Sequence, residues 1–421
     1  MPFLIIARLC DTRPDTDPNK IAFSTMRNIA SQPQPLKGLM VLELGTMITA
    51  PLAGMLLAHA GADVIKVEHP KGGDPFRSFR GGLYSPNFMV YNHGKRSVKL
   101  NLQSEAGRAV LRKLLERADV LVENYRPGVL ARLGFGPDEI RKTYPRLIHC
   151  SITGFGATGP YSGRPAFDTI GLALSGIGAS QWNPEDPQIM GPTVSDYVTG
   201  MYACYGILSA LHERNRTGLG RRVEANLLEC SIAVMADYVA NFTQLGISSK
   251  PLSRTAASHA FAFRCADGKL LAVHLSRHEK FWTSLLTAIA RPDLGHEEKF
   301  ATRQNRIENY LELRKILSAV FAAKPRKHWM QVLEEQDVPF APVNDTPEVC
   351  DDPQVRHLGT LCATTHPTEG NIVALRNPVL FDGDRPDVIA APTLGEHTSG
   401  VLADLGYSEQ DILELQKAEA I

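Results

Sequence analysis

Residues 39–68 read LMVLELGTMITAPLAGMLLAHAGADVIKVE, and this segment indicates the architecture of much of the chain. An apolar run at 39–44 is followed by small and apolar residues at 51–61 and by a second apolar run at 62–68. Short apolar runs on either side of a helix-length stretch predict a strand, a helix and a strand. Strands joined in this way pair in parallel within one sheet.

The same alternation continues beyond this segment. The amphipathic stretch 104–118, with Ser104 as its expected N-cap, predicts a second helix, and a short helix is expected from Pro137. Further strands are predicted at 96–102, 119–125 and 146–154. The fold class that follows is α/β, with a doubly wound, mostly parallel, Rossmann-like sheet.

Sheets of this class bind ligands in the crevice at the carboxyl ends of their strands. Three strand-end segments are therefore predicted to line a site: ELGTMITAP at 43–51, VENYRPG at 122–128 and SITGFGATGP at 151–160. The first strand-to-helix turn lacks GxGxxG, and GxxxxGK[ST] does not occur in the sequence. Because these phosphate-binding loops are missing, neither NAD nor ATP is expected as a cofactor.

The length of the chain predicts two domains, since 421 residues exceed one ordinary core. The polar, small-residue stretch 244–258 marks a boundary. Beyond it, FAFRCADGKLLAVHL predicts two short strands, and helices are expected near 278–290, 307–323 and 326–337. The predicted organisation is a loose N-terminal tail at 1–35, a large α/β domain at 36–243, a small α+β domain at 250–338 and a return segment at 339–421 that completes the large domain.

The composition excludes several classes of partner. The chain carries 45 basic and 45 acidic residues, so its charge gives no reason to expect nucleic acid or an anionic membrane. No stretch approaches the roughly 18 apolar residues of a membrane-spanning helix. The seven cysteines form no CxxC pair and the histidines form no HExxH motif, so neither a metal site nor a disulfide framework is expected. This usage favours a reducing compartment, and we expect a cytoplasmic location.

Asp196 follows PTVS and opens the apolar stretch 196–215, which predicts a long helix. Its ordinary role would be that of an N-cap that accepts a backbone N–H. A carboxylate at a helix N-terminus is also kept ionised by the helix dipole, as a nucleophile requires. The two roles are compatible, and the local sequence leaves both open.

Two arginines, Arg126 and Arg132, lie in VENYRPGVLARLGFG just past a predicted strand end. Guanidinium groups at such positions commonly hold phosphates. The alternative is a solvated loop whose arginines make surface ion pairs.

Six strings together closely resemble the class III CoA-transferase family, in order and spacing, over about residues 36–415. The resemblance implies an enzyme whose substrates are an acyl-CoA and a small carboxylic acid, with no tightly bound cofactor. It also implies an interlocked homodimer, in which the small domain of one chain covers the site of its partner. The strings are GLMVLELGTMITAPLAGMLLAHAGADVIKVEHP, YNHGKRSVKLNL, VENYRPGVLARLGFG, SITGFGATGP, SDYVTGMYACYGILSAL and APTLGEHTSGVLADLGY.

The family's catalytic aspartate heads a helix in a segment that SDYVTG, residues 195–200, matches. The resemblance therefore implies Asp196 as the nucleophile. In such transferases the carboxylate attacks the acyl-CoA carbonyl, which gives an aspartyl anhydride and free CoA thiolate, and the thiolate then forms an aspartyl thioester. Covalent bonds conserve the thioester energy, so this route needs no ATP.

Related 2-methylacyl-CoA racemases pair the same aspartate with a histidine about thirty residues earlier, in a Gly-His-Asp string, since racemisation needs two bases. Here the corresponding residues are Ala166, Phe167 and Asp168. Phe167 cannot take a proton. This departure favours a transferase over a racemase or epimerase, and a non-catalytic acyl-CoA-binding protein is the third alternative.

The resemblance also implies which residues contact CoA and what acid is used. The expected CoA-binding residues are His69, Leu100 (through its backbone), Asn124, Arg126, Arg132, Phe167 and Asp168. Formyl-CoA transferase has a glycine-rich loop over the aspartate, where this chain has AASHAF at 256–261. A larger acid, such as a dicarboxylate, is therefore expected in place of a formyl or oxalyl group, with succinyl-CoA as a candidate donor.

Overall fold

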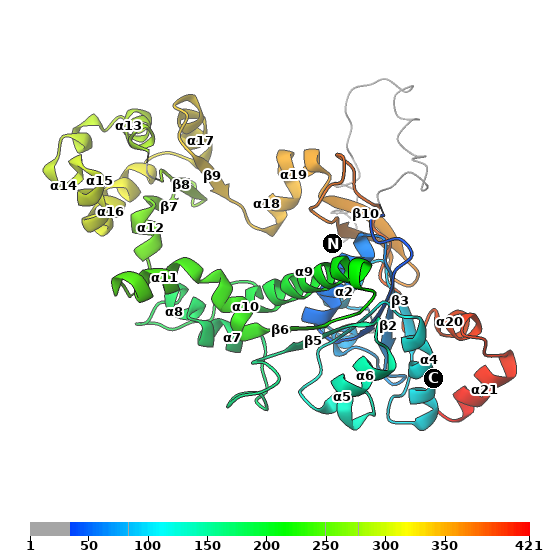
Figure 1. Cartoon of the computed structure of the whole chain (residues 1–421). Coiled ribbons are helices and arrows are strands. Elements are labelled where there is room, and N and C mark those ends of the chain that lie inside the picture. The colour runs from blue at the N-terminus through cyan, green and yellow to red at the C-terminus, as the bar shows by residue number, and fades with distance from the viewer. Residues whose placement is uncertain (1–33, 83, 249, 277) are drawn as a thin grey trace, which may run out of the picture. The chain divides into compact units, whose positions relative to one another are not determined.

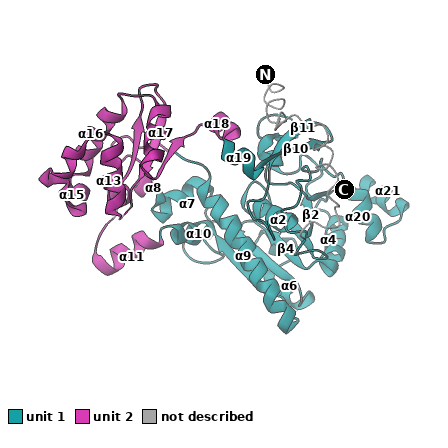
Figure 2. Cartoon of the chain, turned by 90° about the horizontal axis from the view of Figure 1, so that it is seen from above, with its two compact units in different colours: residues 1–177, 190–235, 353–421 teal, residues 178–189, 236–352 magenta. Residues whose placement is uncertain are grey.

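The computed structural model describes residues 34–421 with the exception of 83, 249 and 277. The tail predicted at 1–35 lies, up to residue 33, outside the described residues. The chain forms two compact units, which Figure 2 shows in teal and magenta. The first comprises the described residues up to 177 with 190–235 and 353–421, and the second comprises 178–189 and 236–352. The domain bounds drawn from the sequence stay a prediction.

The first unit is built on a six-stranded sheet in the order β3-β2-β1-β4-β5-β6 (Figure 1), and every neighbouring pair is parallel. The order reverses between β1 and β4, which is where doubly wound sheets open a crevice at the strand ends. The α/β fold class predicted from the sequence is confirmed. The strands are β1 Met40–Leu44, β2 Asp63–Glu68, β3 Arg96–Lys99, β4 Val120–Glu123, β5 Ile148–Thr153 and β6 Arg222–Asn226.

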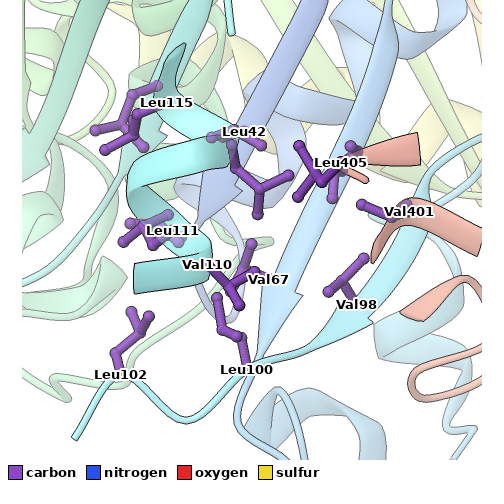
Figure 3. Packing of buried hydrophobic residues seen from close by; sticks show 14 of the residues in the cluster. Leu42, Val67, Val98, Leu100, Leu102, Val110, Leu111, Leu115, Val401 and Leu405 are labelled. Atoms are coloured by element: carbon purple, nitrogen blue, oxygen red, sulfur yellow. The ribbon is translucent and has the colours of Figure 1, made fainter. Parts of the chain in front are cut away.

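Successive strand side chains point to opposite faces of the sheet. The side chains on both faces are apolar, and helices cover both faces. Val41 packs with α2 (Thr49–His59) and α9 (Val194–Thr217) on one face. Its neighbour Leu42 packs on the other face (Figure 3), with α4 (Glu105–Arg117) and α20 (Thr398–Asp404). Both faces are buried, so the strands read as apolar runs and not as alternating patterns.

Short elements complete the first unit. Ser104 caps α4 as predicted, because its hydroxyl accepts the Gly107 N–H at 3.0 Å. The remaining elements are η3 Pro75–Ser78, α3 Pro86–Met89, α5 Val129–Arg132, α6 Pro137–Thr143, α7 Asp168–Ser175, α10 Leu227–Val234, α19 Pro353–Leu358, β10 Leu361–His366, β11 Gly370–Leu375 and α21 Glu409–Lys417.

The second unit contains a three-stranded antiparallel sheet, β7-β8-β9, with its own apolar core. Pro342 is tolerated in β9 because this strand lies at the sheet edge, where one side needs no backbone donor. The elements of the unit are α11 Ala236–Leu245, α12 Ser253–Ala257, β7 Ala260–Arg264, β8 Leu270–His274, α13 Glu279–Ala288, η4 Pro292–Gly295, α14 Glu298–Ala301, α15 Arg303–Glu308, α16 Tyr310–Phe321, α17 Arg326–Glu335, β9 Phe340–Val343 and α18 Thr346–Asp351, while α8 Ile177–Gln181 begins at the unit boundary.

Within the described part of the chain, no helix has both the length and the apolar character needed to cross a membrane.

Candidate active site

A cavity of about 220 Å³ lies at the carboxyl ends of the parallel strands. The three strand-end segments predicted at 43–51, 122–128 and 151–160 all contribute to its wall, because parallel strands end at the same edge of the sheet. The lining residues are Thr46, Met47, Ile48, Thr49, Asn124, Tyr125, Arg126, Pro127, Ile152, Thr153, Gly154, Ser162, Arg164, Pro165, Ala166, Phe167, Asp196 and Leu227.

Asp196 lines this cavity from the first turn of α9. The helix begins at Val194 and its N-cap is Thr193, so the interpretation of Asp196 as the N-cap is wrong. Its own backbone N–H donates instead to Oδ1 of Asp168, at 3.1 Å. The Asp168 carboxylate, from α7, thus satisfies one of the backbone N–H groups at the start of α9. The Asp196 side chain is not needed for this capping role.

Both carboxyl groups have raised pKa values. Burial raises the pKa of Asp196 to about 7, and the negative charge of Asp168 adds to this shift. Burial also raises the pKa of Asp168, although the backbone N–H groups of Asp196 and Ser195 oppose that change. Burial thus opposes the ionisation that was expected from the helix N-terminus.

The loop between β1 and α2 is held in the cavity wall by Asn124. Its Oδ1 accepts the Thr46 N–H at 3.0 Å, and its Nδ2 donates to the Thr46 carbonyl at 2.8 Å and to Thr49 Oγ1 at 3.0 Å. The α9 helix approaches the same loop closely, since a Cβ on Gly200 would lie 2.8 Å from the Thr49 carbonyl oxygen. Asn124, which was predicted from the resemblance as a CoA contact, thus fixes a loop that lines the same cavity as Asp196.

A buried ion cluster supports the same loop from behind. Met47 has a φ of 66°, and its N–H donates to the Asp74 carboxylate at 3.1 Å. Lys66 Nζ lies 2.9 Å from Asp74 Oδ2 and 2.8 Å from Glu43 Oε1, and all three side chains are fully buried. Sequence reasoning missed this cluster, because Glu43 and Lys66 sit inside runs that look like ordinary apolar strands.

Replacing Lys66 with methionine should destabilise the fold strongly. The substitution takes the cation partner from buried Asp74, while Glu43 keeps its pair with Lys95. Breaking a buried pair in this way typically costs about 3–5 kcal/mol. Urea unfolding would measure the loss of unfolding free energy. Lys71→Met is the matched control, because the Lys71–Glu419 pair is largely exposed and should contribute at most about 1 kcal/mol. Equal losses in the two variants would contradict the structural role of Lys66.

Four of the predicted site residues meet at the cavity. Asn124, Arg126, Phe167 and Asp196 line it, with the Phe167 side chain 67% exposed. Asp168 reaches the site through its bond to the Asp196 backbone. Arg164 also lines the cavity, and no pattern in the sequence marked it.

Three predicted CoA contacts do not line this cavity. His69 is exposed after β2, and its Nδ1 accepts the Lys71 N–H at 3.1 Å. Leu100 is buried in the core (Figure 3), and its N–H donates to the Glu68 carbonyl at 2.7 Å. Arg132 is exposed at the end of α5. The roles of these residues in CoA binding stay predictions.

No group of three or more His, Cys, Asp or Glu side chains among the described residues could hold a metal ion. The cavity wall thus contains one partly buried carboxyl group, that of Asp196, and two arginines, Arg126 and Arg164. Such a site can form a covalent bond with an electrophilic carbonyl and can attract an anionic substrate.

Residues 36–398 match the family model described as CoA-transferase family III. The chain belongs to this family. The resemblance inferred from the sequence strings is confirmed, and the protein is a CoA-transferase.

Relatives of this CoA-transferase resemble it over nearly their whole length. Succinyl-CoA:glutarate CoA-transferase of Homo sapiens is 33% identical over 410 residues, which are 94% of this chain and 91% of the relative. Succinate--glutarate CoA-transferase of Agrobacterium fabrum is 33% identical over 406 residues, 91% of this chain and 99% of the relative. The solved structure of a CAIB/BAIF family protein from Brucella suis has a TM-score of 0.79 and 32% identity, covering 89% of this chain and 100% of that one.

Proposed function

We propose that this CoA-transferase moves CoA from succinyl-CoA to a dicarboxylic acid, with Asp196 as the nucleophile. The observation that carries the proposal is the position of Asp196 in the wall of a strand-end cavity that Arg126 and Arg164 also line. The relatives named for succinyl-CoA and glutarate support the choice of acids, because both are dicarboxylates. A screen of acceptor acids with succinyl-CoA, read by mass spectrometry, tests it: failure of every dicarboxylate alongside transfer to monocarboxylates would contradict the proposal.

The reaction proceeds through bonds to one carboxyl group. The Asp196 carboxylate attacks the thioester carbonyl, the C–S bond breaks, and CoA leaves as its thiolate from an aspartyl anhydride. The thiolate then attacks the aspartyl carbonyl, which releases the first acid as a carboxylate and leaves CoA on Asp196. The incoming acid attacks this thioester to form a second anhydride, and the thiolate finally takes up the new acyl group and frees the Asp196 carboxylate.

The surroundings of Asp196 favour this covalent chemistry. Burial and the neighbouring Asp168 disfavour the charged carboxylate, which is why its pKa rises to about 7. Acylation turns the carboxylate into an uncharged anhydride or thioester, so the same surroundings penalise the intermediate less than the free carboxylate. Arg126 supplies the positive charge that an anionic substrate requires.

The proposal predicts an unusual pH dependence. Only the ionised carboxylate attacks, so kcat/KM for the acyl-CoA should rise with pH up to about 7 and then level off, falling about tenfold per unit below that pKa. The Asp168→Asn variant removes the neighbouring charge and should move the midpoint to lower pH. Measured profiles of both enzymes decide the matter: a flat profile down to pH ~5, as an ordinary aspartate would give, would contradict the role of burial.

A second copy of the chain is part of the proposal. Met201, Tyr205 and Leu208 are exposed by 51%, 69% and 41% and lie on one face of α9, at spacings that place them in a row. A row of large apolar side chains on an exposed helix is typical of an interface. Together with the interlocked dimer implied by the resemblance, this row supports a homodimer. We also propose that the protein is located in the cytoplasm, as its cysteine usage predicts.

Light scattering of the purified protein tests the dimer. The expected mass is twice the 46.1 kDa of one chain, and Tyr205→Glu should shift the mass toward one chain by burying a charge in the interface. Glu224→Gln, an exposed change on β6, is the control and should leave the mass unaltered. A monomeric unsubstituted protein would contradict the proposal.

A further inference from the structure

The loop between β5 and α7 supplies a run of residues to the wall of the active-site cavity, and Arg164 is one of them. The two ends of this loop pack together, since a Cβ on Gly154 would lie 2.4 Å from Cβ of Ala166. Between the ends, the rings of Phe155 and Tyr161 meet edge to face, with centroids 5.9 Å apart. The loop is therefore folded on itself, and its part of the wall is preformed.

The guanidinium group of Arg164 stacks on a ring of the same loop. Its Cζ lies 4.0 Å from the centroid of the Tyr161 ring, and the Arg164 backbone N–H donates to the Tyr161 carbonyl at 2.9 Å. Pro165 follows directly and disfavours a helical backbone at Arg164. Stacking covers the face of the guanidinium plane and leaves the N–H groups at its edge able to bind a carboxylate in a fork.

This guanidinium group is exposed, and no described residue forms an ion pair or a side-chain hydrogen bond with it. The lining of the cavity contains one carboxyl group, that of Asp196, and the two arginines Arg126 and Arg164. The nearby Asp168 carboxylate accepts the backbone N–H groups of Asp196 and Ser195. The lining thus has more cationic than anionic side chains.

Acylation of Asp196 would enlarge this imbalance. In the anhydride and the thioester of the proposed reaction the Asp196 carboxyl group carries no charge, so the lining then has arginines and no anion. The distal carboxylate of a dicarboxylic acid supplies a negative charge at this stage, whereas a monocarboxylic acid does not. Arg126 is predicted from the resemblance to contact CoA, which leaves Arg164 for the acid.

The size of the cavity fits a small acid. Its volume is about 220 Å³, whereas pockets that bury a drug-sized ligand measure about 300–1,000 Å³. The cavity therefore accommodates the acid and the reacting end of the acyl-CoA, and not the whole CoA molecule. Because Asp196 and Arg164 line the same small space, each end of a short dicarboxylate has a partner there.

We propose that Arg164 is the specificity-determining residue that recognises the distal carboxylate of the dicarboxylic acid, an inference that rests on the proposed function. Its guanidinium edge donates paired N–H···O bonds to the carboxylate that is not joined to CoA, both in the incoming acid and in the succinyl group of the donor. Tyr161 positions the guanidinium group for this contact.

Transfer from succinyl-CoA to glutarate and to valerate tests Arg164, because these acids have the same chain length and differ in the distal carboxylate. The quantity compared is kcat/KM for the acceptor, which in a ping-pong reaction does not depend on the donor step. Arg164→Gln should lower this value about tenfold or more for glutarate and leave it within about twofold for valerate. Arg164→Lys keeps the charge without the fork and should fall in between. If valerate is not turned over, its inhibition constant against glutarate transfer is compared instead.

Two further variants complete the test. Arg216→Gln changes an exposed arginine of α9 outside the cavity wall and should alter transfer to neither acid. Tyr161→Leu removes the ring beneath the guanidinium group and should lower kcat/KM for glutarate, although less than Arg164→Gln does.

An Arg164→Gln enzyme with unchanged kcat/KM for glutarate, or with equal losses for glutarate and valerate, would overturn the role of Arg164. The same conclusion would follow if Arg126→Gln removed the preference for glutarate and Arg164→Gln did not. An unsubstituted enzyme that transfers CoA to monocarboxylic acids alone would instead contradict the proposed function, and the role of Arg164 with it.

Discussion

Replacing Asp196 with alanine is expected to lower kcat for CoA transfer by about 10⁴-fold or more, since enzymes that lose their nucleophile lose effects of this size. The cavity contains no second carboxyl group among its lining residues that could form the anhydride. Asp168, the nearest carboxylate, accepts the Asp196 backbone N–H and belongs to another helix. The loss of kcat is measured as the steady-state rate at which the new acyl-CoA forms from succinyl-CoA and a dicarboxylic acid.

A matched control separates this effect from damage to the fold. Asp237 is exposed and also lies in the first turn of a helix, α11, so Asp237→Ala makes the same chemical change away from the cavity. Surface changes usually alter stability by no more than about 0.5 kcal/mol, so we expect this variant to fold and to keep kcat within about twofold. An Asp196→Ala enzyme that retains more than about a tenth of the original kcat would contradict the nucleophilic role.

Asn124→Ala is expected to lower kcat/KM by about 100-fold, because misplacing a catalytic surface by about 1 Å has effects of this order. The substitution removes the three hydrogen bonds that tie Thr46 and Thr49 to the end of β4. The loop that lines the cavity together with Asp196 should then lose its fixed position, while the sheet should keep its structure. Kinetics with varied acyl-CoA measures kcat/KM, and far-ultraviolet circular dichroism checks that the fold is retained.

Two further variants sharpen the role of Asn124. Asn124→Asp keeps the acceptor for the Thr46 N–H but loses the two donated bonds, so it should fall between the unsubstituted enzyme and Asn124→Ala. Asn371→Ala alters an exposed residue of β11 and should have no effect on kcat/KM. If Asn124→Ala retained full kcat/KM, the hydrogen bonds would be dispensable for the site.

The architecture could be predicted because its signal is local. The apolar runs at 39–44, 62–68 and 119–125 are long enough to show buried strands, and the stretches between them are long enough for helices. The topology rule for parallel sheets then indicated that three distant loops would line one cavity. By contrast, 155–195 is rich in Gly, Pro and Ser and gave no sign of the helix α7 at Asp168–Ser175.

The protonation of Asp196 could not be predicted, because it depends on a tertiary contact. Asp168 lies 28 positions earlier, and only the fold brings its carboxylate to the Asp196 N–H. The sequence showed a helix start and suggested an ionised carboxylate. Burial, the larger cause of the raised pKa, is likewise a property of packing and not of the local sequence.

The buried ion cluster around Lys66 also depends on tertiary contacts and could not be predicted from the local sequence. Lys66 within ADVIKVE gives no sign that its ammonium group ends between Glu43 and Asp74. A lysine in a strand is ordinarily expected at the surface. Here its partners come from another strand and from the segment after β2, so the cluster that supports the Met47 loop became visible only in the folded chain.

The covalent intermediate on Asp196 is the most direct test of the mechanism. Incubation of the enzyme with succinyl-CoA and hydroxylamine, followed by proteolysis and mass spectrometry, should reveal a hydroxamate on the peptide that contains Asp196, and only when succinyl-CoA is present. A hydroxamate on a different residue, or an unmodified Asp196 in an enzyme that is turning over, would contradict the account.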